Sequence, residues 1–176
     1  MRIESPNFTA QDLAGFLNEL DESDRLALAD RLERASARLG EVAARLPAAP
    51  PRQSGEAWSA LEVLAHIAVL SKFYGMLTYK IGKGEMTELD LVGNVGLRDV
   101  LGEQLSRLPA AELVDMARAD QARTVAYLRS ADGAALRRQC STGGGLSMAA
   151  GEVARLPLCA HLEQHLRQLE DTLGPG

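Results

Sequence analysis

The three histidines are the residues whose type and spacing most directly suggest chemistry. His161 and His165 are four positions apart, and His66 lies much earlier in the sequence. In an α-helix, residues four apart share a face, with Cβ atoms about 5–6 Å from each other. Two such imidazoles, joined by a third from a facing helix, can bind one divalent ion and leave a coordination position open for water or substrate. The histidines therefore predict a reactive metal site.

The donor set narrows the chemistry of that site. Neutral imidazole suits zinc, nickel, copper or iron, and a bound ion would lower the pKa of a water or thiol and polarise a substrate. Leu162 follows His161, so the HExxH pattern of zinc proteases, with its glutamate base, is not present. The alternative is that the histidines are hydrogen-bonded residues of the core.

Helical periodicity places the three imidazoles on inward faces. On a helix that advances about 100° per residue, His66 falls within an apolar stripe that includes Val63 and Ile67. His161 and His165 fall beside the stripe of Leu158 and Leu162, at the edge of the core. We therefore expect the ion near one end or side of a bundle, facing an opening.

Two polar residues are candidates for supporting roles. Glu62 lies one turn before His66, where its carboxylate could accept the non-ligating N–H of that imidazole. It is the one candidate for a catalytic base, and the alternative is a solvated helix glutamate. Gln168 lies near His161 on the helical wheel and could hydrogen-bond beside the site, or be a boundary residue. Cys159 points away from His161 and is not expected to bind the ion.

The elements that must position these residues are helices. Apolar residues make up 46 % of the chain, and only seven residues are aromatic, which favours helices over sheets. No alternating strand pattern competes. Helices are expected over residues 9–20 (capped by Thr9 with Asp12), 23–46, 59–81, 98–107, 109–131 and 147–173, separated by a polar joint at 21–24, a proline-rich segment at 47–56 and loops at 85–97 and 132–146.

These ranges predict an all-α fold, an antiparallel four-helix bundle with an extra short N-terminal helix and long inter-helix loops. Residues 1–176 are expected to form a single domain, with residues 1–22 as an N-terminal helical extension. Pro157 lies inside the last helix, where it should remove one hydrogen bond and bend the helix just before His161. Trp58 is interpreted as a packing residue at a helix start, and Tyr74, Tyr79 and Met76 are interpreted as core residues.

Composition excludes several classes of partner. The formal net charge of −5 and the lack of a basic stripe argue against a nucleic-acid binder. No uninterrupted apolar run of about 18 residues predicts a membrane span, and the N-terminal residues lack the apolar run of a signal peptide. Cys140 and Cys159 match no CxxC pattern and are expected to be reduced thiols of a cytoplasmic protein.

Two segments resemble the DinB/YfiT-like family of helical bundles. AWSALEVLAHI (57–67) is similar to its second-helix signature, and SMAAGEVARLPLCAHLEQHLRQL (147–169) is similar to its last helix. The resemblance implies a four-helix bundle that binds a divalent metal through His66, His161 and His165. The sequence departs from the family pattern at Gln164, Leu166 and Arg167.

The resemblance also implies a range of activities. Known members include metal-dependent S-transferases and isomerases that use low-molecular-weight thiols such as mycothiol or bacillithiol, and others are described as hydrolases. We therefore expect a metal-dependent enzyme that activates water or such a thiol on a small-molecule substrate. Zinc or nickel is the expected ion, followed by iron or manganese, and a homodimer is the expected assembly. The alternative is a non-catalytic, stress-related bundle that binds a metal or ligand.

Overall fold

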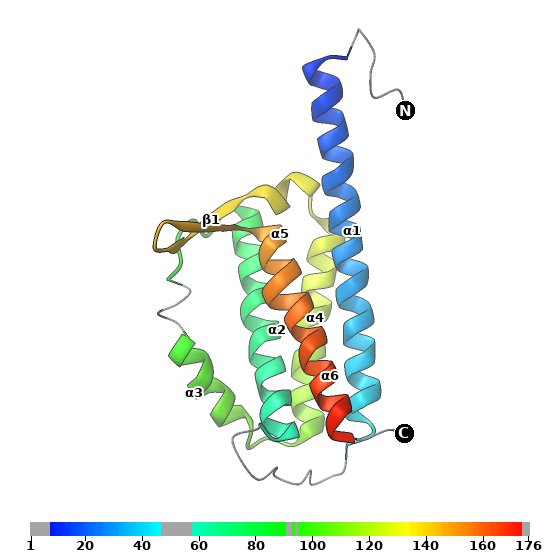
Figure 1. Ribbon diagram of the computed structural model, residues 1–176, viewed down its shortest axis with the longest axis vertical. Coiled ribbons are helices and arrows are strands. Elements are labelled where there is room, and N and C mark those ends of the chain that lie inside the picture. The colour runs from blue at the N-terminus through cyan, green and yellow to red at the C-terminus, as the bar shows by residue number, and fades with distance from the viewer. Residues whose placement is uncertain (1–7, 47–57, 91–92, 94, 174–176) are drawn as a thin grey trace.

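The computed structural model describes residues 8–46, 58–90, 93 and 95–173, and within them the predicted all-α bundle is confirmed (Figure 1). The predicted linker at 47–56 and the chain end at 174–175 lie outside the described residues. The elements are α1 (Ala10–Ala43), α2 (Ala60–Lys83), α3 (Val95–Leu105), α4 (Ala110–Ser130), the 3₁₀ turn η1 (Gly133–Arg137), β1 (Gln139–Gly143), β2 (Leu146–Ala149), α5 (Ala150–Val153), the π-helical segment η2 (Ala154–Ala160) and α6 (His161–Leu173).

The long helices run in two pairs of opposite direction. Helices α1 and α6 descend in the view of Figure 1, whereas α2 and α4 ascend. Consistent with this, Arg31 pairs with Glu163 and Arg38 with Glu170, so α1 and α6 advance together. The neighbours α2 and α4 are therefore parallel, and the chain between them must cross the length of the bundle. Helix α3 lies in that crossover, beside α2.

Small residues bring α2 and α4 close together. A Cβ atom on Gly75 would clash with the side chain of Thr124, and one on Gly82 would clash with the hydroxyl of Tyr127. Glycine at these positions lets the two backbones approach each other. Among the described residues, α2 is the one helix long and apolar enough to cross a membrane, but 67 % of that apolar stretch is buried in the bundle. It is thus the core helix.

The separate N-terminal helix expected before residue 23 is not observed, because α1 is continuous from Ala10. Thr9 and Asp12 form the expected capping box at its start. The polar segment at 21–24 contains neither glycine nor proline, so nothing in it breaks a helix. Its acidic side chains face other elements: Glu22 accepts from the Gly133 N–H, and Asp24 pairs with Arg155.

A β-hairpin occupies part of the segment that was expected to be irregular. Strands β1 and β2 pair antiparallel, with Cys140 opposite Met148. Gly143, Gly144 and Gly145 form the turn, and all three have positive φ, between 60° and 88°. This conformation is costly for residues with a side chain, so the glycine run ends one strand and begins the other. Ser147, the predicted helix start, therefore belongs to β2.

The last helix contains a widened turn immediately before the histidine pair. Pro157 lies in the π-helical segment η2. The backbone N–H of His161 donates to the Leu156 carbonyl, five residues back, instead of to that of Pro157. The expected disturbance at Pro157 is thus a π-turn, a feature that is often found at functional sites.

Candidate metal centre

The fold brings the three histidines together at the contact between α2 and α6. The ring centroids of His66 and His161 are 5.4 Å apart, those of His66 and His165 4.8 Å, and those of His161 and His165 4.6 Å. One ligand nitrogen from each ring lies within 4.8 Å of the others. The set is thus close to the spacing that a shared ion requires, with metal–nitrogen bonds of about 2.0–2.1 Å.

The three rings are not buried in the order that helical periodicity predicts. His165 is the most buried, with 7 % of its surface exposed, whereas His66 and His161 are half-buried. Periodicity fixes the angle of a residue about its helix axis but not its depth along the bundle. His66 lies in the second turn of α2 and is only partly buried, although its neighbours Ala65 and Ile67 are buried. The cluster is accordingly open on the side of His66 and His161.

The hydrogen bond of His165 defines which of its nitrogens is available. Its Nδ1 lies 2.9 Å from Oε1 of Gln168. Because an amide oxygen can only accept, Nδ1 carries the proton and Nε2 keeps its lone pair. Nε2 is buried and has no hydrogen-bond partner among the described residues. Buried polar atoms are nearly always paired, so an unpartnered nitrogen on a ring whose centroid is 4.6 and 4.8 Å from those of two other imidazoles fits a metal ligand.

Burial also favours the protonation state that binds metals. Burial lowers the pKa of His161, and the neighbouring His165 lowers it further. Burial lowers the pKa of His165 as well, although its bond to Gln168 acts in the opposite direction. Both imidazoles are therefore disposed to be neutral at neutral pH, and a metal ion requires the neutral form.

Glu62 caps the helix that carries His66. Its Oε2 accepts the Ser59 N–H at 2.7 Å, and its own N–H donates to Ser59 Oγ at 3.3 Å. This capping box holds the first turn of α2 in place, one turn before His66. The structure thus gives Glu62 a structural role, and its role as a base stays a prediction.

Cys159 lies apart from the three-histidine group, as its position on the helix predicted. Its side chain is fully buried, and burial raises the pKa of the thiol to about 11. The charged groups that act on it are Arg31, Glu163 and Arg155. A thiol with so high a pKa is a packing residue rather than a metal ligand or nucleophile.

Trp58 is the site neighbour that the sequence analysis missed. Its indole contacts the edge of His66, with centroids 4.7 Å apart, and stacks on His165 at 6.1 Å and an interplanar angle of 13°. Trp58 precedes the helix by two residues, so helical periodicity assigned it no direction. Its position about two helical turns before His66 is the sequence feature that could have identified it as a neighbour of the site.

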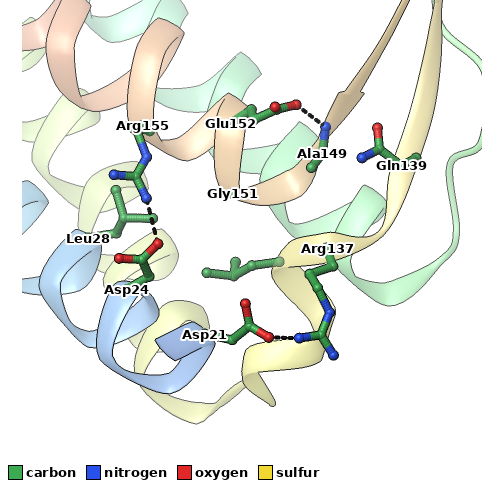
Figure 2. A pocket seen from close by; sticks show the side chains of 10 residues that line it. Asp21, Asp24, Leu28, Arg137, Gln139, Ala149, Gly151, Glu152 and Arg155 are labelled. Carbon is green, nitrogen blue, oxygen red and sulfur yellow. Dashed lines mark hydrogen bonds and ion pairs between the residues drawn. The ribbon is translucent and has the colours of Figure 1, made fainter. Parts of the chain in front are cut away.

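A second group of polar side chains has a different character. Figure 2 shows a cleft of about 380 Å³ between the middle of α1 and the hairpin–α5 region. Asp24 accepts from Arg155 at 2.9 Å, and Asp21 pairs with Arg137. Glu152 accepts the backbone N–H of Ala149 at 2.7 Å. These groups join elements to one another, which is a structural role. In the histidine cluster, by contrast, Nε2 of His165 has no hydrogen-bond partner among the described residues.

Comparison with known proteins supports this description. A family model described as the DinB superfamily matches residues 8–169. No curated protein matches the chain. A solved structure of a histidine-to-alanine mutant of the mycothiol-dependent maleylpyruvate isomerase has a TM-score of 0.66 at 17 % identity, and the match covers 88 % of this chain and 61 % of that one. This likeness shows the shared fold, over less than two thirds of the isomerase. Because the family match runs from the start of α1 into α6, the chain belongs to the DinB superfamily.

Proposed function

We propose that this protein is a metal-dependent enzyme in which His66, His161 and His165 hold one divalent ion. The observation that carries the proposal is the three-histidine cluster, in which one ligand nitrogen from each ring lies within 4.8 Å of the others and Nε2 of His165 is buried without a hydrogen-bond partner among the described residues. Zinc or nickel is the ion we favour, followed by iron or manganese, because imidazole is a good ligand for the first two.

The residues of the chain prepare this site in distinct ways. Gln168 holds the proton on Nδ1 of His165 and so keeps Nε2 as the donor atom. Trp58 contacts two of the rings from outside the three-histidine set. The half-exposed His66 and His161 leave an approach for a small molecule. When bound, the ion would lower the pKa of a coordinated thiol or water and polarise the substrate.

We propose a low-molecular-weight thiol as the activated group, ahead of water. The similar isomerase is described as mycothiol-dependent, which supports thiol chemistry in this fold. A thiol bound to a metal loses its proton without a separate base, whereas water attack commonly uses one. The proposed reaction is thus an S-transfer or isomerisation, with hydrolysis as the second candidate.

The proposal extends to the surroundings of the enzyme. The substrate is a small molecule, the assembly a homodimer, and the compartment the cytoplasm, where low-molecular-weight thiols stay reduced. The competing proposal is a non-catalytic bundle in which the same ion serves binding or stability.

Elemental analysis of the purified protein tests the metal site. We expect about one divalent ion per chain in the wild type and a nearly metal-free His161→Ala variant, because a site with two imidazoles holds an ion weakly. Gln164→Ala is the matched control, since Gln164 is exposed between the two histidines of α6. A wild type that stays metal-free after reconstitution would contradict the proposal.

Activity assays then separate the two classes of function. Metal-loaded protein is assayed for thiol transfer to electrophilic substrates and for ester and amide hydrolysis. Activity that requires both the ion and a thiol supports the proposed reaction, and activity with the ion alone supports hydrolysis. A metal-loaded protein that is inert in both assays supports the non-catalytic bundle.

A further inference from the structure

Trp58 lies at the solvent side of the three-histidine cluster. It is the only tryptophan of the chain, and 42 % of its surface is exposed. Tryptophan is usually largely buried, because its ring system removes a large apolar area from water. Tyr74, which lies further along the chain within α2, is only 7 % exposed. The exposure of Trp58 next to a candidate ligand site therefore needs an explanation.

The contacts of Trp58 account for only part of its indole. One contact is with the edge of His66 on α2, and the other is the near-parallel stack on His165 of α6. The indole thus bridges the two helices that supply the ligands. Trp58 is 42 % exposed, so part of the indole is open to solvent beside the cluster, in which His66 and His161 are also partly exposed.

We infer that Trp58 is a specificity-determining residue whose exposed indole surface receives a flat apolar group of the substrate while the substrate's anionic donor atom meets the ion. The inference rests on the proposed function, because it requires an ion on the three histidines. Aromatic rings favour offset stacking with other flat groups, and such a group would cover surface that is otherwise exposed to water.

The charge of the proposed ion indicates which second group the substrate carries beside its flat apolar group. An indole face attracts cations when it is isolated. Here a divalent ion on the adjacent imidazoles would repel a cationic group and attract an anionic donor. The substrate class that fits is therefore an anionic donor, such as a thiolate or carboxylate, joined to an aromatic or conjugated group.

A pair of small chelators tests the inference without knowledge of the substrate. Acetohydroxamate and benzohydroxamate present the same anionic donors, and only the second has a flat apolar ring. Binding of each to the Co²⁺-loaded protein is followed by the visible absorption of the ion. We expect the ratio of the two affinities, benzohydroxamate over acetohydroxamate, to fall about fivefold to tenfold from the wild type to Trp58→Ala, with acetohydroxamate affinity nearly unchanged.

Two further variants separate a substrate contact from a structural role. Trp58→Phe retains a smaller flat surface and should give an intermediate ratio. Tyr79→Ala is the matched control, because Tyr79 on α2 is 41 % exposed but packs against Tyr127. Its ratio should equal that of the wild type. An equal ratio in wild type and Trp58→Ala would overturn the inference, as would an equal loss of affinity for both chelators.

The same experiment distinguishes this inference from the proposed function. A wild type that binds no Co²⁺ contradicts both. A wild type that binds Co²⁺ with a ratio insensitive to Trp58 leaves the metal site standing and overturns only the role of the indole. Because Trp58 precedes α2 and is half-exposed, its replacement is compatible with folding, and the Co²⁺ content of each variant verifies this.

Discussion

Two faces of α6 carry polar residues that the protein uses in opposite ways. On the face toward α1, Glu163 accepts two hydrogen bonds from Arg31, at 2.6 and 2.7 Å. Glu170 accepts the same kind of forked pair from Arg38. On the face toward α2, His165 has one bond, to Gln168, and a buried nitrogen without a partner among the described residues.

This difference distinguishes side chains that hold α6 against α1 from side chains that we propose as metal ligands. Arg31 and Glu163 match each other in charge and geometry, and the hydrogen bonds from Arg31 lower the pKa of the Glu163 carboxyl. Such a pair is complete and has no need of a further partner. The histidine face instead has a buried nitrogen without a partner among the described residues. Substitutions on the two faces should therefore change different properties of the protein.

The largest effect is expected for His165→Ala on the affinity for Zn²⁺ or Ni²⁺. Loss of the most buried of three ligands should weaken binding by about 100-fold or more. The wild type should also gain about 2.7 kcal/mol of stability when the free ion is at 100 times its dissociation constant, and the variant should lose this gain. Calorimetric titration and melting with and without the ion measure both quantities.

The matched substitution on the other face is Glu163→Gln, which should leave the affinity for the ion within about twofold of wild type. Equal losses in His165→Ala and Glu163→Gln would show that the two faces do not differ.

A smaller effect on ion affinity is expected for Gln168→Ala. This change removes the acceptor that keeps the proton on Nδ1 of His165, and loss of such a partner typically weakens metal binding by about 10- to 100-fold. Competition with a chelator of known affinity gives the value. Arg167→Ala, at the neighbouring exposed position, is the control, and a Gln168→Ala affinity equal to that of the control would remove Gln168 from the site.

On the α1 face, Arg31→Met should change stability and not ion binding. The side chains of Arg31 and Glu163 are 32 % and 28 % exposed, so solvent screens the pair and its loss should cost only about 0.5–1 kcal/mol. Urea denaturation of the ion-free protein measures the cost. A loss of ion affinity in Arg31→Met, at full retention of fold, would mean that the α1 face also positions the ligands.

The smallest expected effect is the pH dependence of the stability that is lost in Arg31→Met. Because Arg31 lowers the pKa of Glu163 below its usual 4.5 in the folded protein, the stabilisation is present above pH 4.5 and is lost as pH falls through the folded pKa. The stability difference between wild type and Arg31→Met should thus stay constant down to about pH 4.5 and shrink as pH falls further. The midpoint of urea unfolding, measured in EDTA, follows it, and a difference that stays constant at lower pH as well would contradict the assignment.

Much of the bundle could be predicted because its signals are local. The capping residue Thr9 and Gly84, which follows α2, mark helix ends within a few residues. The continuity of α1 could not be predicted from its apolar pattern, because residues 21–24 are polar for reasons outside the helix. Their partners, among them Gly133 and Arg155, lie more than 100 residues away in the sequence.

The candidate site likewise has features that the local sequence predicts and features that depend on how the helices pack. The spacing of His161 and His165 and the inward face of His66 were sufficient to predict the cluster. The π-turn at Pro157 and the depth of His165 depend on how α6 packs, which no single helix pattern contains. Trp58 lies outside any periodic element, so its stacking on His165 follows only from the meeting of two helices.

The crossover between α2 and α4 has a consequence for how the protein is made. His66 leaves the ribosome early, whereas His161 and His165 follow only after the crossover, α4 and the hairpin have been synthesised. A nascent chain that ends before α6 has one histidine and cannot form the three-histidine set. In the proposed site, metal loading would thereby be reserved for molecules in which the final helix has docked, so occupancy of the site would report completed folding.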